Sequence, residues 1–267
     1  MFRCAVVVLA LAALSGCASA PGSSPPQATE VVAVPIAQAV EIGRAPVRRA
    51  TRTERQTVTA FGRYGKQGRL TLETRALLDA SKSGSEVSVE LLFTGADTKS
   101  EGVQESAVGN IDVFRGLEGV TLLYRRDLVT GRVRQGMVKD GRAVNIGGTR
   151  VAITGRLIAQ SHLGGMTLRQ GQTVMEFSLS DFLSGLDPIA SPTMQGTVAG
   201  RSVYQGRDVV VVTLDQSPEH RGVSYHVKGT YLIDVLTGLP VSGRVSVIGD
   251  EDGQETIRLA VDQRLVF

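Results

Sequence analysis

Cys17, one of the two cysteines in the sequence, lies just after the first apolar run of the chain. A cysteine acts as a nucleophile through its thiolate, so Cys17 is a candidate for covalent attachment of another group. Met1-Phe2-Arg3 supplies one positive charge, and the segment from Ala5 to Leu14 is uninterrupted apolar sequence. This layout is typical of a secretory signal, and the segment is shorter than the roughly 20 apolar residues that cross a bilayer. The sequence therefore predicts an exported chain with a thiol at the end of its signal.

The residues Leu14-Ser15-Gly16-Cys17 resemble the lipobox of bacterial lipoproteins. The resemblance implies that residues 1–16 are removed as a signal peptide, that the Cys17 sulfur receives a diacylglycerol, and that the new amino group is often acylated. The alternative is an ordinary signal cut after Ala18-Ser19-Ala20, an A-x-A-like site. That cut would remove Cys17 and leave its spacing from the apolar run unexplained.

The same resemblance predicts where the protein lies. In such lipoproteins an Asp directly after the cysteine favours the inner membrane, whereas Ala18 and Ser19 follow Cys17 here. We therefore expect the outer membrane, with the domain on the periplasmic face and the membrane as a partner through the lipid on Cys17. Each buried methylene of an acyl chain contributes about 0.8 kcal/mol, so two or three chains would anchor the protein stably.

Cysteine usage and composition exclude several kinds of site. Cys4 lies in the signal, and Cys17 is expected to carry lipid, so the mature chain has no thiol for a disulfide, a zinc site or a nucleophile. Aromatic residues make up 4% of the chain and Trp is absent, which argues against an aromatic-lined sugar or nucleic-acid site. The net charge of +3 is modest, and we expect no nucleic-acid partner.

The densest basic stretch lies close to the expected anchor. It consists of Arg44, Arg48, Arg49, Arg52 and Arg55. These side chains could rest on anionic headgroups, at around 1 kcal/mol per charge near the surface. The alternative is a solvated linker or edge strand.

Residues 17–50 are predicted to be the lipidated cysteine and a proline-rich linker. Their prolines are Pro21, Pro25, Pro26, Pro35 and Pro46. Proline-rich chain is extended at about 3.1 Å per residue, so the linker would hold the domain tens of ångströms from the bilayer.

Residues 51–267 predict one all-β domain, built as a curved antiparallel sheet or open half-barrel with short helices, and long enough to form its own core. Apolar and polar residues alternate through 223–235 and 257–264, which indicates one buried and one wetter face. The segment from Val209 to Val212 is apolar on both sides, as in a strand covered twice. Further alternating runs lie at about 68–78, 85–94, 119–126 and 132–139.

Turn signals separate these runs. Asp140-Gly141 and Asp252-Gly253 predict tight hairpins, because Gly tolerates the positive φ that such turns need. Two segments, 127–131 and 234–238, share the pattern Asp-x-x-Thr-Gly, and we expect each Asp side chain to accept from backbone amides of its turn. This recurrence suggests duplicated halves, 51–155 and 156–267, with chance recurrence of a common turn as the alternative.

Helical signals are few. Ser180 is predicted to cap a turn or two of helix over 181–183, and 156–163 is predicted to be another short helix. The loop bounded by Pro188 and Pro192 is a candidate lid across the open sheet.

The remaining chemical candidates are weak. His162, His220 and His226 lack metal-ligand spacing, and Asp250 to Gly253 is a hairpin tip rather than a calcium loop. Gly62, Gly65 and Gly68 lack the dinucleotide-binding spacing, so a bend is expected there. No serine lies in a nucleophile elbow. We therefore predict a protein that is not an enzyme and has no metal or cofactor, while a hydrolase with an unrecognised site stays a third hypothesis.

The C-terminal run alternates apolar residues from Ile257 to Phe267, which resembles the last strand of outer-membrane β-barrels. Arg258, Asp262 and Arg264 on its other face, and the low aromatic content, argue against a lipid-facing strand.

The pattern as a whole is similar to that of the lipoprotein carrier and receptor superfamily of LolA and LolB. The resemblance rests on the lipobox, the β-meander order, and the segment from Tyr231-Leu-Ile-Asp234 to Thr237-Gly238-Leu239-Pro240. It implies an unclosed barrel with helices as a lid, whose concave face binds acyl chains or another apolar ligand, but it transfers no ligand-binding residue. The predicted function is non-enzymatic ligand binding at the envelope. The alternative is an assembly lipoprotein that binds another envelope protein at a sheet edge.

Overall fold

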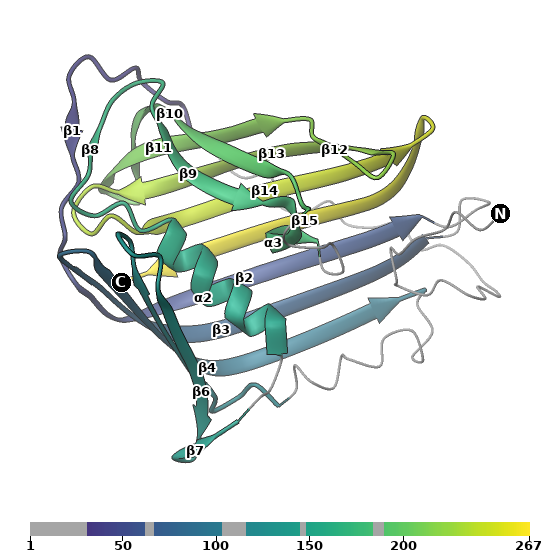
Figure 1. Cartoon of the computed structure of the whole chain (residues 1–267), viewed down its shortest axis with the longest axis horizontal. Coiled ribbons are helices and arrows are strands. Elements are labelled where there is room, and N and C mark those ends of the chain that lie inside the picture. The colour runs from purple at the N-terminus through teal and green to yellow at the C-terminus, as the bar shows by residue number, and fades with distance from the viewer. Residues whose placement is uncertain (1–30, 62–66, 103–115, 145–147, 184–189) are drawn as a thin grey trace.

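The structure is a computed structural model that describes residues 31–61, 67–102, 116–144, 148–183 and 190–267 (Figure 1). Its main feature is one antiparallel sheet of 13 strands, and a separate pair of short strands lies beside it. Two helices are present among the described residues. None of the described helices is long and apolar enough to cross a membrane.

The first half of the sheet is a meander of six strands. They are β2 (Val47–Phe61), β3 (Gln67–Ser83), β4 (Glu86–Glu101), β5 (Thr121–Asp127), β6 (Val133–Lys139) and β7 (Arg142–Ala143). Each pairs with the next in an antiparallel register.

The second half contains the remaining strands of the large sheet. They are β9 (Thr173–Ser178), β10 (Thr193–Tyr204), β11 (Arg207–Gln216), β12 (Glu219–His220), β13 (Val223–Asp234), β14 (Pro240–Glu251) and β15 (Gln254–Val266). The separate pair consists of β1 (Val40–Glu41) and β8 (Thr167–Leu168), and the helices are α2 (Gly148–Gln160) and α3 (Leu179–Phe182).

The strand order across the sheet is β7-β6-β5-β4-β3-β2-β15-β14-β13-β11-β10-β9. The first and last long strands, β2 and β15, pair along their length and join the two halves. Strands β7 and β9, at the two ends of this order, do not pair with each other, so the sheet is not closed. The sheet is curved, and α2 crosses its concave side (Figure 1). The predicted all-β fold with a curved antiparallel sheet and short helices is confirmed. The two halves follow the same strand order, as a duplication would produce, but their common origin stays a prediction.

The alternating pattern in the sequence positions the core. In β13, Val227 and Ile233 are fully buried, whereas His226 and Lys228, on either side of Val227, are exposed. Tyr225, Val227, Tyr231 and Ile233 lie on the concave side, where they pack against other strands and the helices, whereas Leu232 is buried on the other face. The predicted inward and outward faces of this strand are therefore confirmed.

The concave side holds two apolar clusters. One joins β9 to β15 with α3, and the other joins β2 to β5 with the end of α2. A third, smaller cluster lies on the convex side, where Val209 and Val211 contact Val31 and Ala33. This cover explains why β11 is apolar on both faces, as predicted for a strand that is buried twice.

Both Asp-x-x-Thr-Gly turns have the predicted geometry. Asp127 accepts from the backbone N–H groups of Val129 and Thr130, both at 2.9 Å, and these bonds hold the pKa of the Asp127 carboxyl below its usual range. Asp234 accepts from the backbone N–H and the hydroxyl of Thr237, at 2.9 and 2.8 Å. The two turns differ in burial, because Asp127 lies in an exposed turn whereas the Asp234 side chain is 3% exposed.

The glycines of the two turns show the same difference. Gly131 and Gly238 both have positive φ, at 68° and 76°. A Cβ at Gly238 would lie 2.3 Å from the backbone nitrogen of Gly164, whereas a Cβ at Gly131 would meet nothing within 4 Å. The second turn is thus packed into the molecule, and the first is free at the surface.

These two turns give a matched pair for a stability test. Asp234→Ala should lower the free energy of unfolding by roughly 3 kcal/mol, because it removes a buried charged acceptor and leaves Arg207, its ion-pair partner at 2.9 Å, without an anion. Asp127→Ala should have a much smaller effect, since water can replace the lost bonds at the surface. Urea unfolding followed by circular dichroism measures both, and equal losses would contradict the difference in burial.

The helices differ from the sequence-based expectation at their ends. Helix α3 begins at Leu179, and its N-cap is Ser178 rather than Ser180. Ser178 has extended backbone angles and its N–H donates to Asp181, whereas the N–H of Ser180, inside the helix, donates to Ser191. Helix α2 begins eight residues before the predicted start at residue 156.

The linker prediction reached too far along the chain. Strand β2 already begins at Val47, and Val40 and Ile42 are buried in the core of the second half. Val34 exchanges two backbone hydrogen bonds of 2.8 Å with Arg201 of β10. Residues 31–50 thus contact the domain, with Val40 and Ile42 in the concave core and Val31 and Ala33 against the convex cluster. The signal residues 1–16, Cys17 and the linker to residue 30 lie outside the described residues.

Candidate functional site on the concave face

Helix α2 covers the middle of the concave face (Figure 1). It packs against β4, β5 and β9. A Cβ at Gly155 would lie 3.1 Å from the Cβ of Tyr124 and 3.0 Å from Leu122, so this glycine allows the helix to approach β5 closely. At the end of the helix, the Ser161 hydroxyl donates to the carbonyls of Leu157 and Ile158 in the last turn.

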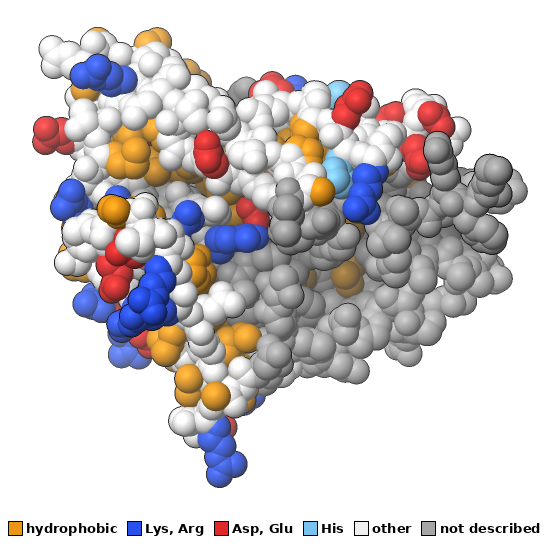
Figure 2. Space-filling view, viewed as in Figure 1, with side chains coloured by type: hydrophobic (Ala, Val, Ile, Leu, Met, Phe, Trp, Pro, Cys, Tyr) orange, Lys and Arg blue, Asp and Glu red, His pale blue; other side chains and the backbone are white. Residues whose placement is uncertain are grey.

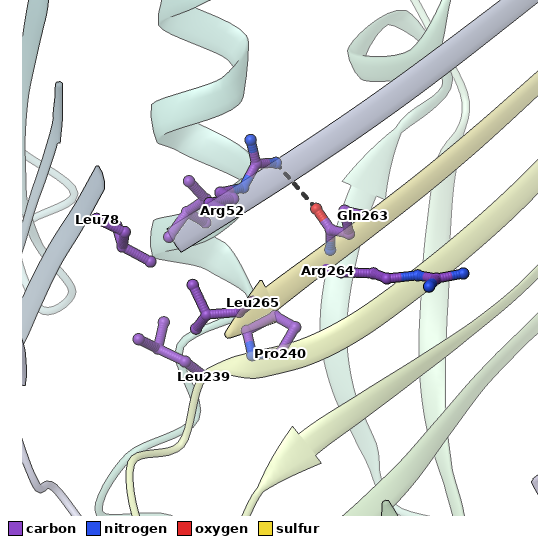
Figure 3. Close-up of a pocket in the computed structure, with 8 residues that line it drawn as sticks. Arg52, Leu78, Leu239, Pro240, Gln263, Arg264 and Leu265 are labelled. Atoms are coloured by element: carbon purple, nitrogen blue, oxygen red, sulfur yellow. Dashed lines mark hydrogen bonds between the residues drawn. The ribbon is translucent and has the colours of Figure 1, made fainter. Parts of the chain in front are cut away.

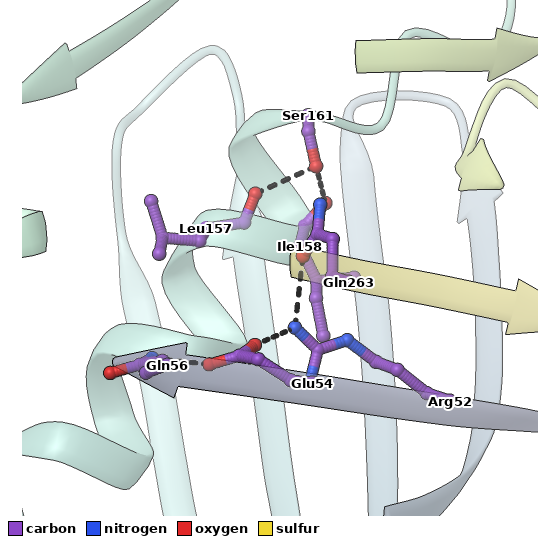
Figure 4. A network of polar contacts seen from close by, with 7 residues as sticks. All are labelled: Arg52, Glu54, Gln56, Leu157, Ile158, Ser161 and Gln263. Atoms are coloured by element: carbon purple, nitrogen blue, oxygen red, sulfur yellow. Dashed lines mark hydrogen bonds and ion pairs between the residues drawn. The ribbon is translucent and has the colours of Figure 1, made fainter. Parts of the chain in front are cut away.

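A polar cluster lies beneath the end of α2, between the two apolar clusters (Figure 4). Arg52 and Glu54 of β2 form an ion pair, although they are only 5% and 8% exposed. Arg52 also donates to Gln263 of β15 at 3.0 Å, and Gln56 donates to Glu54. Alternate residues of a strand share a face, so positions 52, 54 and 56 all point to the concave side. We call these four residues the polar cluster.

Tyr231 lies next to the polar cluster. Burial raises the pKa of its phenol well above the usual range, and the nearby Glu54 carboxylate raises it further. Gly243 on the adjacent strand has no side chain, and a Cβ there would meet Gln263 at 2.4 Å and the Tyr231 ring at 2.8 Å. The glycine therefore makes room for both side chains on the concave face.

A small pocket opens beside the polar cluster (Figure 3). Its lining residues are Arg52, Leu78, Ile158, Leu239, Pro240, Gln263, Arg264 and Leu265. Four leucine and isoleucine side chains form an apolar wall, and Arg52 and Gln263 place polar atoms on the other side. The lining of this small pocket therefore presents both apolar and polar atoms.

Apolar side chains along the middle of the concave face are only partly buried by the described residues. Val58 of β2 lies opposite Leu70 of β3 and Leu259 of β15. Val58, Leu70 and Val261 have intermediate exposure, and Leu157 of α2 faces the same cluster. These positions offer apolar surface next to the polar cluster.

Helices α2 and α3 are joined by an ion pair. Arg156 of α2 donates to Asp181 of α3, whose side chain is 2% exposed. Phe182 of α3 packs edge-on against Phe177, with ring centroids 5.8 Å apart. Of the predicted lid, Pro188 lies outside the described residues, and the backbone carbonyl of Pro192 accepts from Leu179.

His162 is a buried histidine just after α2. Its Nδ1 accepts from the backbone N–H of Gly164 at 3.2 Å. Burial lowers the pKa of His162 to about 4, and the positive charge of Lys82 lowers it in the same direction. The side chain is therefore neutral in the folded protein above that pH.

The low pKa of His162 predicts acid sensitivity. Between pH 6.5 and about 4, the unfolded chain binds a proton that the folded chain does not, so the free energy of unfolding falls as the pH falls, by on the order of 3 kcal/mol. Urea titrations across this range should show that slope. His162→Asn keeps an acceptor for Gly164 but does not titrate, so it should flatten the slope. An unchanged slope would show that other groups cause it.

The other two histidines do not form a metal site with it. His220 is buried in β12, and His226 lies on the exposed face of β13. Within the described ranges, no group of three histidine, cysteine or acidic side chains could hold a metal ion. The Nδ1 of His226 lies 3.0 Å from the Ser217 hydroxyl, at an exposed site. In the part of the chain that the structure describes, this histidine makes no hydrogen bond to an orienting carboxylate, which a serine nucleophile site would need.

The structure separates the arginines of the basic stretch. Arg44, Arg48 and Arg49 are exposed. Arg52 points into the concave face, and Arg55 pairs with Glu73 on the opposite face. The polar cluster was missed by the sequence analysis, which grouped Arg52 with its basic neighbours. Its signal was the period-2 spacing of charged and amide residues at 52, 54 and 56 in a strand whose other inward residues are apolar.

No protein-family model matches the sequence, and no curated protein is significantly similar to it. Among solved structures, lipovitellin, from work on lipid-protein interactions, aligns with a TM-score of 0.42 and 11% identity over 83% of this chain and 25% of that chain. This chain thus spans about a quarter of the lipovitellin chain. DynF from the dynemicin biosynthesis pathway of Micromonospora chersina aligns with a TM-score of 0.24 and 11% identity, over 91% of this chain and 92% of that one. A putative AttH from Nitrosomonas europaea has a TM-score of 0.17 and 10% identity, over 82% of this chain and 51% of that one. These similarities assign neither a family nor a function to the chain.

Proposed function

We propose that the protein is a non-enzymatic, lipid-anchored binding protein of the bacterial outer membrane, facing the periplasm, that holds an apolar or acyl ligand on its concave face. The observation that carries the proposal is the partly buried apolar surface around Val58, Leu70 and Val261, next to the pocket beside the polar cluster. Burial of apolar ligand surface there would contribute about 25 cal/mol per Å². The lipobox resemblance at Leu14 to Cys17 supports the anchoring.

Binding is tested with a fluorescent fatty acyl probe and the chain from Ala18, which keeps every described strand and helix. Val58→Gln places an amide in the apolar surface and should weaken saturable binding roughly tenfold. Thr57→Gln is the matched control, because Thr57 is the neighbouring residue on the opposite face of β2. Absence of saturable binding, or equal effects of both variants, would refute the proposed site.

Anchoring is tested separately in cells. Radiolabelled palmitate should label the full chain, and Cys17→Ser should abolish the label and leave the chain uncleaved at this position. Labelling that persists in Cys17→Ser, or unlabelled protein that is free in the periplasm, would overturn the anchor but not the ligand site.

A second candidate function is that of an assembly lipoprotein that binds another envelope protein. The open sheet favours it, since β7 and β9 each end the strand order and leave edges to which an extended segment can pair. Cross-linking in cells distinguishes the two functions, because one dominant protein adduct on an edge strand favours assembly.

A further inference from the structure

The edge of the sheet formed by β5, β6 and β7 concentrates positive charge. Residues 121–143 contain six Lys and Arg residues but only two Asp and no Glu, whereas the whole chain has 29 basic and 26 acidic residues. The basic residues are Arg125, Arg126, Arg132, Arg134, Lys139 and Arg142. In Figure 2, Lys and Arg side chains gather over this edge of the molecule, with hydrophobic side chains among them.

Three of these arginines have no counter-charge among the described residues. Arg125, Arg132 and Arg134 are exposed, and none of them forms an ion pair with a described residue. Arg125 of β5 lies directly opposite Arg134 of β6. Like charges in directly opposite positions destabilise a sheet. Several exposed arginines elsewhere in the sheet instead face acids, as in the pairs Arg69–Glu101 and Arg244–Asp262.

Apolar side chains project from the same hairpin. In the turn between β5 and β6, Leu128 is 42% exposed and Val129 is 83% exposed. Val133, at the start of β6, is 44% exposed. Solvent-exposed apolar side chains that are flanked by arginines are typical of protein surfaces that lie in the interface of an anionic membrane.

The hairpin extends beyond the core of the domain. On the concave side of β5, the side chains of Leu122 and Tyr124 are buried, but residues 133–136 of β6 are all exposed. Strand β7 pairs only with the other end of β6, at Val138 and Lys139. Both faces of the first half of β6 are therefore available to a partner surface.

The tip of the hairpin lies at the same end of the sheet as the contact between Val34 and β10. The turn at 128–131 and the turn at 205–206 lie at the same end, because strands in an antiparallel meander alternate in direction (Figure 1). Val34 contacts Arg201, four residues before the second turn. The described part of the chain thus begins close to the end of the sheet that carries the hairpin.

We propose that the β5–β6 hairpin docks the domain on a membrane leaflet that contains anionic phospholipids. Arg125, Arg132 and Arg134 contact lipid phosphates, and Leu128 and Val129 insert among the headgroups. This inference rests on the proposed function only in placing the protein at a membrane. The contacts between the hairpin and the lipid headgroups depend neither on the acyl chains on Cys17 nor on the concave site. Docking would fix the orientation of a domain that the linker alone leaves free to rotate.

The test measures co-sedimentation of the unacylated chain from Ala18 with vesicles. One set contains phosphatidylcholine alone, and the other contains equal parts of phosphatidylcholine and phosphatidylglycerol. The chain should bind the anionic vesicles, and high salt should release it because these charges are exposed. Replacing Arg125, Arg132 and Arg134 together with Gln should reduce partitioning on the order of 100-fold. Leu128→Ser with Val129→Ser should also reduce it.

The matched control is the triple variant Arg55→Gln, Arg69→Gln and Arg258→Gln. It removes the same charge from exposed arginines that are paired with Glu73, Glu101 and Glu255, so it should retain most of the binding. Equal losses in both triple variants, or equal binding to both vesicle types, would overturn the proposal. Self-association through the β6 edge or salt-sensitive binding to an acidic protein, without vesicle binding, would also overturn it. If palmitate labelling or binding of the acyl probe fails, vesicle binding by the hairpin should be unchanged. Such a failure would count only against the proposed function.

Discussion

Glu54→Gln should lower the free energy of unfolding by about 3–5 kcal/mol, among the largest effects of any single substitution in this sheet. Arg52 is 5% exposed, and its described partners are Glu54 and Gln263. The substitution keeps the size of the side chain at position 54 but leaves the guanidinium buried without an anion. Urea unfolding followed by circular dichroism measures the loss, since the chain has no Trp to report by fluorescence.

Two comparisons isolate the effect of burial. Glu73→Gln breaks the ion pair between Arg55 and Glu73, whose side chains are 58% and 40% exposed, and should cost less than about 1 kcal/mol. The double variant Arg52→Met with Glu54→Leu removes both buried charges and should recover most of the stability. If Glu54→Gln costs no more than Glu73→Gln, the polar cluster is solvated in solution.

The polar cluster also bears on the proposed ligand site. An apolar face that binds acyl chains does not need buried charges, which are costly to remove from water. Arg52 and Gln263 both line the pocket, so they place hydrogen-bond donors beside its leucine wall. If an acyl ligand with a carboxylate binds there, Gln263→Leu should weaken binding of that ligand more than it weakens binding of the corresponding methyl ester. This comparison would show whether the cluster contacts the ligand or only joins β2 to β15.

The sequence predicted the sheet well because its signals are local. Alternation in 223–235 depends only on neighbouring residues, and the structure places Val227 inside and His226 outside. The hairpins at Asp140-Gly141 and Asp252-Gly253 require positive φ at both positions, and these residues have it. Turn chemistry and strand period therefore predicted the class of fold, and they did so without any matching family.

The contact between the polar residues of β2 and Gln263 could not be predicted, because it joins distant residues. Arg52 meets Gln263 only because β2 pairs with β15, which is 211 residues away at that contact. Spacing along the chain carries no information about that pairing. The sequence analysis therefore grouped Arg52 with its basic neighbours. In the structure, burial next to Glu54 separates Arg52 from them.

The start of α2 was missed for a related reason. Gly155 disfavours a helix by roughly 1 kcal/mol relative to Ala, so the sequence indicated a helix only after it. In the structure the helix continues through Gly155, since the missing Cβ allows contact with Leu122 and Tyr124 of β5. Packing against the sheet thus outweighs local propensity.

Phe177→Ala should destabilise the fold by about 3–5 kcal/mol. Phe177 is 1% exposed, its ring stacks on Tyr231 with centroids 5.6 Å apart, and it also contacts Phe182 of α3. Truncation would leave a cavity where β9, β13 and α3 meet, and neighbouring strands can close it only in part. Urea unfolding measures the loss, which should appear as a lower midpoint with an unchanged slope.

Control substitutions separate cavity formation from loss of the aromatic contacts. Phe177→Leu retains most of the volume and should cost about half as much or less, whereas Val203→Ala, at a residue that is 69% exposed, should have almost no effect. If Phe177→Leu is as costly as Phe177→Ala, ring stacking rather than volume holds α3 on the sheet. In that case the Tyr231 ring, which lies between Phe177 and the polar cluster, would link the position of α3 to the concave face that we propose as the ligand site.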